Sequence, residues 1–281
     1  MRLEGRLSDR GVPNPQSRNG LLFYDSPLLG SVEGLFHAVT TRIGGASEGP
    51  RRYLNLSHRL PTDLDAVAAN RSRVCEAFGI PPGRTVFPDQ VHGDRVARVG
   101  EAEAGAGYAF PDPGIPATDG LLTDRPRLYL FALSADCPIV ALADPRHRGI
   151  ALVHSGRRGT ARDIVGRAVQ AMAREFRSRP GDLFASIGPG IGPCCYEIGP
   201  QVADEIRRVF PAAEAFLPVR ESRVHLDLPA AIRFELRRAG VPDEQIEISP
   251  LCTSCRTDHF YSHRAEGVRT GRFAAILGWR E

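Results

Sequence analysis

The sequence contains no lysine: all 36 of its lysine-or-arginine positions are arginine. This absence excludes Schiff-base chemistry on a lysine amine, and it excludes a phosphate-binding loop of the Walker type. Arginine is then the only side chain with a fixed positive charge that could bind phosphate. Long apolar runs are also missing, since no stretch approaches the roughly 18 residues needed to cross a bilayer. We therefore expect no membrane-spanning segment.

The first residues, Met1–Arg6, lack the apolar stretch of a secretory signal, which favours a cytoplasmic protein. The six cysteines are then not expected to form a disulfide framework. Thiols in a reducing compartment more often bind metal, catalyse or pack in the core. The net charge of +3 is small and scattered, so no binding to nucleic acid is predicted.

Apolar runs and helical patterns mix along the chain without strict alternation. The runs at residues 128–135 and 150–153 are continuous, as is typical of strands covered on both faces. Residues 160–177 show the clearest helical pattern. Residues 1–19 are rich in Gly, Pro, Ser, Asn and Arg and are predicted to form a flexible tail. For residues 20–281 we predict one catalytic domain of the α/β (α+β) class, a mixed sheet flanked by helices.

Two of the predicted strands end in reactive side chains. Asp136 and Cys137 follow the first, and His154 ends the second, while His92 lies between turn residues in an earlier loop. Zinc favours Cys and His donors, and a catalytic zinc keeps three protein ligands and one open position. We hypothesise that His92, Cys137 and His154 bind one Zn²⁺ ion. The alternative is that each histidine is a hydrogen-bonded structural residue and that Cys137 is a core residue.

Asp136 is a candidate proton acceptor, or a partner that orients a ligating imidazole. A turn or capping carboxylate is the alternative interpretation. Cys137 with His154 could also be a thiol nucleophile and its base.

Glycine and arginine meet at two strand-to-turn junctions. Arg42 precedes Gly44-Gly45, and Gly156 precedes Arg158. Glycine lets backbone N–H groups approach an anion, and arginine offers a fork for phosphate oxygens. The helix expected over residues 160–177 would direct its positive end to the same place. We predict an anion pocket here, with exposed arginines beside turn glycines as the alternative.

Cys252 and Cys255 could form a second zinc site with His259 and His263. Their spacing is tighter than the usual zinc-finger pattern. A redox pair is a further alternative, although nothing nearby resembles a thioredoxin-type context. We therefore interpret Cys252 and Cys255 as two packed thiols.

Nine short motifs follow one another in a fixed order along the chain. They are His37–Gly45, Gln90–Gly93, Ala135–Cys137, His154–Gly159, Ile187–Gly199, Leu226–Leu228, Cys252–Cys255, Phe260–Arg264 and Thr270–Arg272. Together they resemble the YfiH-type family, also called the polyphenol oxidoreductase laccase or purine nucleoside phosphorylase family. The resemblance extends over roughly residues 35–279, and so many ordered motifs make coincidence improbable.

The resemblance implies a single α/β domain with zinc at His92, Cys137 and His154. It implies a purine nucleoside phosphorylase, whose partners are a nucleoside (adenosine, inosine, guanosine or methylthioadenosine) and phosphate, and whose products are base and ribose 1-phosphate. Adenosine deamination is attributed to the same pocket. We expect Arg42 and Arg158 to hold phosphate while zinc, Asp136 and Cys137 act on the nucleoside. The sequence favours no particular oligomeric state.

Three other functions remain open. The family is also linked to a Cu²⁺-dependent polyphenol oxidase, but multicopper oxidases need many histidines and this chain has eight. A thiol amidase that edits peptidoglycan precursors would use Cys137 as its nucleophile. A non-catalytic protein stapled by zinc would bind a partner instead.

The chain departs from the family pattern at three positions. Asp89 replaces the usual Asn, Ser134 the usual Thr, and Arg157 the usual Trp. None of these changes deletes an expected zinc ligand. Arg157 removes a stacking surface and adds charge, so it bears on the substrate more than on the metal.

Overall fold

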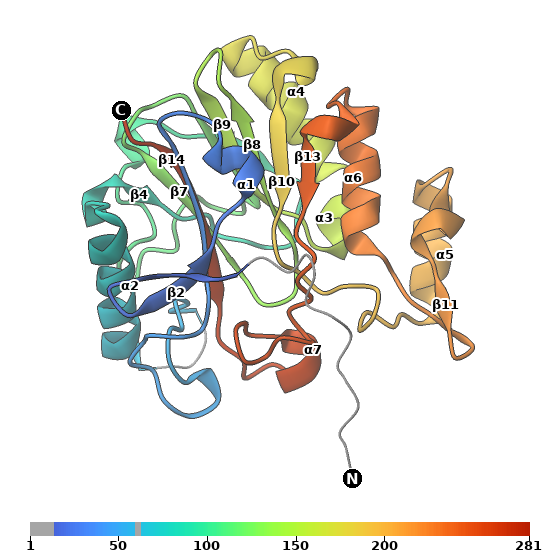
Figure 1. The fold of residues 1–281 in the computed structure, drawn as a ribbon, viewed down its shortest axis with the longest axis horizontal. Helices are drawn as coiled ribbons and strands as arrows, with labels where there is room; N and C mark the ends of the chain where they lie inside the picture. Colours follow the sequence, from blue (N-terminus) through green and yellow to red (C-terminus); the bar gives the residue numbers. More distant parts are fainter. Residues whose placement is uncertain (1–13, 60–62) are drawn as a thin grey trace.

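Two six-stranded sheets lie face to face in the computed structural model, which describes residues 14–59 and 63–281 (Figure 1). The first sheet has the order β1 (Gln16–Arg18), β2 (Leu21–Tyr24), β3 (Leu35–Thr40), β14 (Phe273–Trp279), β7 (Tyr129–Ser134) and β4 (Thr85–Val86). The second has the order β13 (Ile246–Ile248), β10 (Phe184–Ile187), β8 (Ile139–Asp144), β9 (Gly149–His154), β6 (Gly120–Thr123) and β5 (Val96–Arg98). A hairpin pairs β11 (Val219–Arg220) with β12 (Arg223–Val224).

Both sheets are mixed. The pairs β4–β7, β5–β6 and β10–β13 are parallel, and the other pairs are antiparallel. The predicted α/β class with a mixed sheet flanked by helices is therefore confirmed, with two sheets where one was expected.

Helices cover the outer faces of the two sheets, which gives a four-layer arrangement (Figure 1). The helices are α1 (Pro27–Gly30), α2 (Leu64–Phe78), α3 (Arg157–Ala161), α4 (Ile164–Phe176), α5 (Pro200–Val209), α6 (Leu228–Arg238) and α7 (His263–Glu266). Short 3-10 turns are Gly49–Arg51, Pro82–Arg84, Glu101–Glu103, Pro180–Asp182, Ala213–Phe216 and Asp243–Gln245. No helix among the described residues has both the length and the apolar character to span a membrane.

Alternating side chains explain the continuous apolar runs of the central strands. On β9, Leu152 points into the layer between the sheets, whereas Val153 points toward α4 and α6. On β14, Leu277 points into the same central layer, whereas Ile276 packs on the side of α2. Because each strand is covered on both faces, both sets of alternating positions are apolar.

Two expected boundaries differ from the structure. The single helix expected over residues 160–177 is wrong at its start, because the chain forms α3 and then α4. The break falls at Asp163, whose φ of +61° is a left-handed value that aspartate tolerates. Of the expected flexible tail, residues 1–13 lie outside the described residues, while Gln16–Arg18 form β1 and pair with β2.

Glu235 on α6 is a buried acid with a raised pKa. It is 1% exposed, and neither carboxylate oxygen has a hydrogen-bond partner within the described part of the chain. Burial, reinforced by the charge of Asp163 and opposed by Arg238, raises the pKa of Glu235 from 4.5 to about 9. Because the native state holds this proton more tightly than the unfolded chain, Glu235 contributes stability that is complete below pH 4.5 and is lost as the pH rises toward 9.

We expect Glu235→Gln, which stays neutral at every pH, to remove this component of the pH dependence. As the pH rises from 4.5 to 9, the free energy of unfolding of the variant should increase relative to that of the parent, because only the parent loses this contribution. Urea unfolding across this range measures it, with the exposed Glu244→Gln as the matched control. Parallel stability curves for the parent and Glu235→Gln would contradict the assignment.

Candidate metal centre and active site

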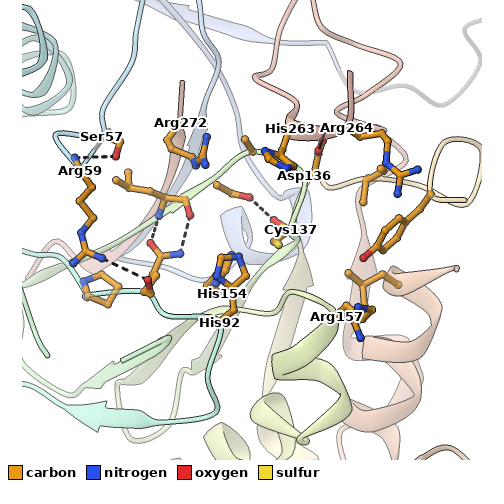
Figure 2. A pocket seen from close by; sticks show the side chains of 18 residues that line it. Ser57, Arg59, His92, Asp136, Cys137, His154, Arg157, His263, Arg264 and Arg272 are labelled. Atoms are coloured by element: carbon orange, nitrogen blue, oxygen red, sulfur yellow. Dashed lines mark hydrogen bonds between the residues drawn. The ribbon is translucent and has the colours of Figure 1, made fainter. Parts of the chain in front are cut away.

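A cavity of about 560 Å³ opens where the ends of β7 and β9 meet the loops between sheets and helices. Its wall includes residues from the loop at 88–92, the turn at 133–137, the start of α3 and the C-terminal segment at 263–272 (Figure 2). Cavities of about 300–1,000 Å³ suit small organic ligands. The cavity is therefore large enough for a nucleoside together with a small anion.

His92, Cys137 and His154 converge in this cavity, as expected for a shared metal site (Figure 2). One donor atom from each lies within 4.8 Å of the others. The two imidazole rings are 4.9 Å apart and nearly perpendicular, at 80°. Zinc bonds to nitrogen and sulfur measure about 2.0–2.3 Å, so small side-chain adjustments would let one ion contact all three donors.

Strand pairing explains why Cys137 and His154 meet. His154 is the last residue of β9 and pairs with Ile139, the first residue of the antiparallel neighbour β8. Cys137 lies two residues before that position, so both donors emerge at one edge of the sheet. His92 arrives from a separate loop and adopts a φ of +59°.

Asp119 holds the whole group together, and the sequence interpretation missed it. Its Oδ1 lies 2.9 Å from Nδ1 of His154, which leaves Nε2 of that ring to face Cys137. The same carboxylate accepts backbone N–H bonds from residues 91, 92 and 93 at 3.1, 3.0 and 2.7 Å. Burial opposes ionisation of Asp119, but the hydrogen bond and charge of His154, followed by the N–H groups of Gly93 and Val91, lower its pKa. A carboxylate behind a ligating imidazole fixes the orientation of the ring.

Asp136 does not orient either imidazole, although this was one of its expected roles. Its Oδ1 accepts a hydrogen bond from the hydroxyl of Thr253, and its Oδ2 accepts one from the backbone N–H of Arg264, both at 2.6 Å. The residue lines the cavity beside Cys137 and has a φ of +96°. The C-terminal segments therefore hold the carboxylate at the cavity wall, and the backbone of Asp136 lies in the left-handed region.

Cys137 and His154 favour each other's charged form. Burial opposes ionisation of the thiol, but His154 and His92 outweigh it and lower the pKa of Cys137 to about 6. Burial likewise opposes the imidazolium, but Cys137 and Asp119 raise the pKa of His154 to about 9. The thiolate is the form of cysteine that binds metal or attacks as a nucleophile.

Gly156 leaves room for the Cys137 thiol rather than for a phosphate. A β-carbon at this position would lie 2.7 Å from Sγ of Cys137 and 3.4 Å from the His92 ring. Gly156 is also the N-cap residue of α3. Close packing against the donor group is thus a sufficient reason for glycine here.

The structure does not bring Arg42 or Arg158 to the cavity. Arg42 is buried, pairs with Glu266 at 2.7 Å and lies over the ring of Tyr261. Arg158 is exposed on α3 and is absent from the cavity wall. Both side chains therefore point away from the cavity. The type of a residue at a strand end does not determine the direction of its side chain. The arginines that line the cavity are Arg59, Arg157, Arg264 and Arg272.

Gly44 and Gly45 also lie away from the cavity, where they allow backbones to pack closely. A β-carbon at Gly45 would be 2.2 Å from the carbonyl oxygen of Tyr53. One at Gly44 would be 2.4 Å from the carbonyl oxygen of Gly20, and Gly44 has a φ of +95°. Neither position has room for a side chain, which explains both glycines without an anion.

The sequence model of the multi-copper polyphenol oxidoreductase laccase family matches residues 36–280. The chain belongs to this laccase-like family. The YfiH-type resemblance drawn from the motifs is thereby confirmed, and it extends over nearly the whole described chain.

Named relatives and solved structures are similar to the chain over most of its length. The chain is 38% identical to the purine nucleoside phosphorylase YlmD of Geobacillus stearothermophilus, over 91% of this chain and 92% of that protein. It is 38% identical to the purine nucleoside phosphorylase Rv2149c of Mycobacterium tuberculosis, over 86% of this chain and 91% of that protein. Among solved structures, YlmD from Geobacillus stearothermophilus has a TM-score of 0.88 at 36% identity, with 95% and 98% of the two chains covered. The hypothetical protein YfiH from Bacillus licheniformis has a TM-score of 0.86 at 35% identity, with 92% of this chain and 96% of that chain covered.

Arg157 and Asp89, two positions at which the motifs depart from the resemblance, both have ion-pair partners. Arg157 lines the cavity and forms an ion pair with Glu205 on α5. Asp89 forms an ion pair with Arg59 at the cavity wall. The ring of Tyr196 offers an aromatic surface at the cavity, with the Arg264 guanidinium 5.3 Å from its centroid.

We expect Asp119→Asn to weaken metal binding by about 10- to 100-fold, the usual effect of removing the partner of a ligating histidine. The variant loses the negative charge that accepts three backbone N–H bonds and orients His154. Competition for Zn²⁺ against a chelator of known affinity measures the change. Asp94→Asn, on the same loop and partly exposed, is the matched control. Equal zinc affinity in the parent and Asp119→Asn would rule out this role.

Proposed function

We propose that this protein is a zinc-dependent purine nucleoside phosphorylase. It would cleave adenosine, inosine, guanosine or methylthioadenosine with phosphate into the base and ribose 1-phosphate. The observation that carries the proposal is the His92–Cys137–His154 group opening into a cavity lined by arginines. The names of the similar proteins support the same reaction class.

His92, Cys137 and His154 would hold the metal, and the donor set fits Zn²⁺. Two imidazoles and one thiolate leave a fourth position open, as in catalytic zinc sites. A bound Zn²⁺ would supply Lewis-acid polarisation of a nucleoside atom at that open position. Copper is the less suitable ion, because a multicopper oxidase needs several histidine-rich centres. Within the described chain, only this group of possible metal ligands contains histidine.

Arg272 is the cavity cation best placed to bind phosphate. Its Nη1 donates to the backbone carbonyls of residues 270 and 271 at 3.1 and 2.8 Å, which orients the planar guanidinium. Burial lowers the pKa of Arg272, while the charges of Cys137 and Asp136 oppose that shift. An arginine held in this way presents its remaining N–H groups as a fork for phosphate oxygens. We therefore assign to Arg272 the role first expected for Arg42 and Arg158.

The cavity wall also offers surface that suits a purine. Ile191, Tyr196 and Leu228 contribute apolar and aromatic surface there. A phosphate oxygen would form the new bond to C1′ of the ribose as the glycosidic C–N bond breaks. The electron pair of that bond leaves with the purine, which then takes up a proton. The carboxylate of Asp136 and the phosphate would stabilise the positive charge that develops on the ribose.

Adenosine deamination is a second candidate for the same cavity. A carboxylate beside a His/Cys metal group is also the arrangement of zinc deaminases, and Asp136 directly precedes Cys137. In that reaction water would add at C6 of the purine and ammonia would leave, and Asp136 would accept a proton from the water and return it to the leaving amino group. Inosine formed from adenosine without phosphate would support this activity.

A thiol amidase is the main rival, because Cys137, His154 and Asp119 also resemble a nucleophile, base and orienting carboxylate. That chemistry gives no role to a second imidazole, yet His92 lies with its ring 4.9 Å from that of His154. An acyl-thioester trapped on Cys137 would favour the amidase.

The phosphorylase proposal predicts phosphate-dependent cleavage of inosine. Ribose 1-phosphate should form from inosine only when phosphate is present, and its release can be assayed directly. No ribose 1-phosphate in either condition, with zinc bound, would reject the proposal.

Arg272→Gln should raise the KM for phosphate by at least about tenfold, corresponding to the loss of about 1.4 kcal/mol or more from a charge-assisted hydrogen bond. Arg158→Gln removes an exposed guanidinium outside the cavity and should leave that KM unchanged. Steady-state kinetics with phosphate as the varied substrate compares the two. A raised KM in Arg158→Gln alone would restore the assignment made from the sequence.

A further inference from the structure

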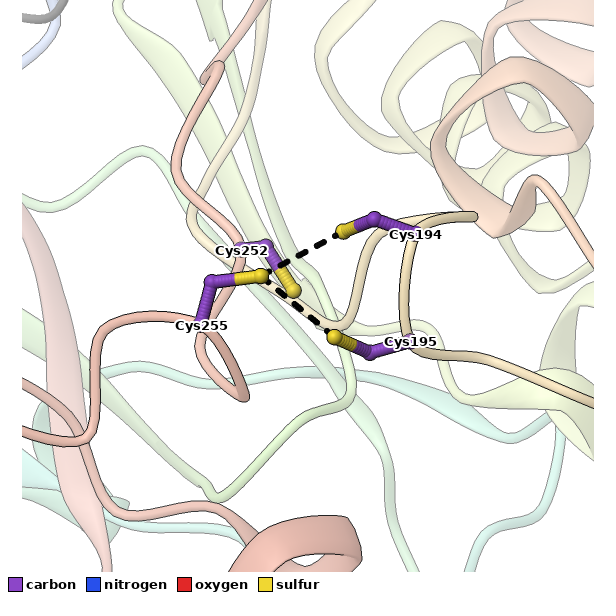
Figure 3. Close-up of side chains that lie close together, drawn as sticks. All are labelled: Cys194, Cys195, Cys252 and Cys255. Atoms are coloured by element: carbon purple, nitrogen blue, oxygen red, sulfur yellow. Dashed lines mark hydrogen bonds between the residues drawn. The ribbon is translucent and has the colours of Figure 1, made fainter. Parts of the chain in front are cut away.

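Four of the six cysteines gather in a second group, outside the proposed active site (Figure 3). They are Cys194, Cys195, Cys252 and Cys255, and their sulfur atoms all lie within 4.8 Å of one another. Cys194 and Cys255 are exposed, and the other two are partly exposed. For Cys252 and Cys255, this exposure argues against the two packed thiols expected from the sequence.

The fold brings two loops together at this point. The strands β10 and β13 are parallel neighbours, so the loops that follow them leave the sheet at the same edge. One loop carries Cys194 and Cys195, and the other carries Cys252 and Cys255. The two loops stay paired beyond the strands, since the N–H of Thr253 donates to the carbonyl of Gly190 at 3.0 Å.

The distances suit four thiolates around one ion. Sγ of Cys255 lies 3.6 Å from that of Cys194 and 3.4 Å from that of Cys195. A tetrahedral zinc with bonds of about 2.3 Å places its sulfur ligands about 3.8 Å apart. A disulfide would need about 2.0 Å, and it would join only two of the four sulfurs.

The surrounding backbone is adapted to sulfur. The N–H of Gly192 donates to Sγ of Cys252 at 3.2 Å, which stabilises negative charge on that atom. A β-carbon at Gly192 would lie 3.3 Å from Sγ of Cys194 and 3.7 Å from Sγ of Cys252. The absent side chain therefore leaves space for sulfurs arriving from both loops.

We propose that Cys194, Cys195, Cys252 and Cys255 bind a second Zn²⁺ ion in a closed tetrahedral site. Four protein ligands leave no open position, so the site is structural. The thiols lose their protons when the ion binds, and the ion joins the two loops as a cross-link.

This cross-link would stabilise the wall of the cavity. The first loop carries Ile191 and Tyr196, which line the cavity. The second carries Thr253, whose hydroxyl donates to Asp136 at 2.6 Å. The ligand set differs from the one considered from the sequence, which joined Cys252 and Cys255 to His259 and His263. His259 instead lies 2.6 Å from the Tyr24 hydroxyl, and His263 lines the cavity.

Metal stoichiometry tests the proposal independently of activity. The full-length protein, purified under reducing conditions and freed of loosely bound metal, should contain two zinc ions per chain by elemental analysis. Cys194→Ser/Cys255→Ser should retain one zinc ion, and Cys137→Ser should also retain one, from the other site. Cys75→Ala, which removes a buried cysteine on α2 that belongs to neither group, should retain two.

One zinc ion in the parent protein that Cys137→Ser loses would overturn the proposal, and so would iron in place of the second zinc. An intact mass lower by two hydrogens for each disulfide, with no second metal, would identify a redox pair instead. If the double variant does not fold, Co²⁺ bound to the Cys137→Ser protein gives an independent measurement. Its thiolate-to-cobalt charge-transfer absorption should have the intensity of four thiolate ligands, and absence of that band would overturn the proposal. Because the two sites share no donor, either can fail without the other.

Discussion

The carboxylate of Asp119 is the constraint on which the proposed active site depends. It is fully buried, and it connects the loop of His92 to the ring of His154 through four hydrogen-bonding contacts. A buried carboxylate is costly unless it is paired, and here each contact that satisfies the charge also positions a donor group. Loop, strand and imidazole are therefore fixed by one side chain that need not touch the substrate.

The four-layer fold places this constraint where it is useful. The strands of the central layers are largely apolar on both faces, and the polar side chains of the two candidate sites gather where strands end. Cys137 and His154 lie at one such edge because β8 and β9 pair antiparallel. The four-cysteine group lies beyond another such edge, at which the parallel strands β10 and β13 both end. The cavity lies between loops that carry both groups, so metal binding at either group would be linked to the shape of the cavity.

Much of the fold could be predicted from the sequence because its signals are local. A continuous apolar run indicates a buried strand whatever its partner is. The convergence of His92, Cys137 and His154 could be predicted as well, since their residue types suit one metal and each follows or ends a predicted element or lies in a turn. The division into two sheets could not be predicted, because no local pattern says which strand pairs with which.

The rest of the site depends on contacts between residues far apart in the sequence. Asp119 lies 35 positions from His154, and no spacing rule connects a carboxylate to the imidazole that it orients. Arg42 has the residue type of a phosphate ligand, but its guanidinium pairs with Glu266, 224 positions away. Arg272 belongs to the motif Thr270–Arg272, whose sequence indicates no role. Its position in the cavity wall makes it a candidate phosphate ligand. Side-chain direction, not residue type, separates these arginines.

The central claim is that His92, Cys137 and His154 share one ion, and anomalous diffraction at the zinc absorption edge tests it most directly. Crystals of the zinc-loaded protein should show a peak within about 2.0–2.3 Å of one atom from each of the three side chains. A fourth position at this ion should be filled by solvent or ligand rather than by protein. No peak between these donors in zinc-saturated crystals, or a peak that excludes the Cys137 sulfur, would contradict the account.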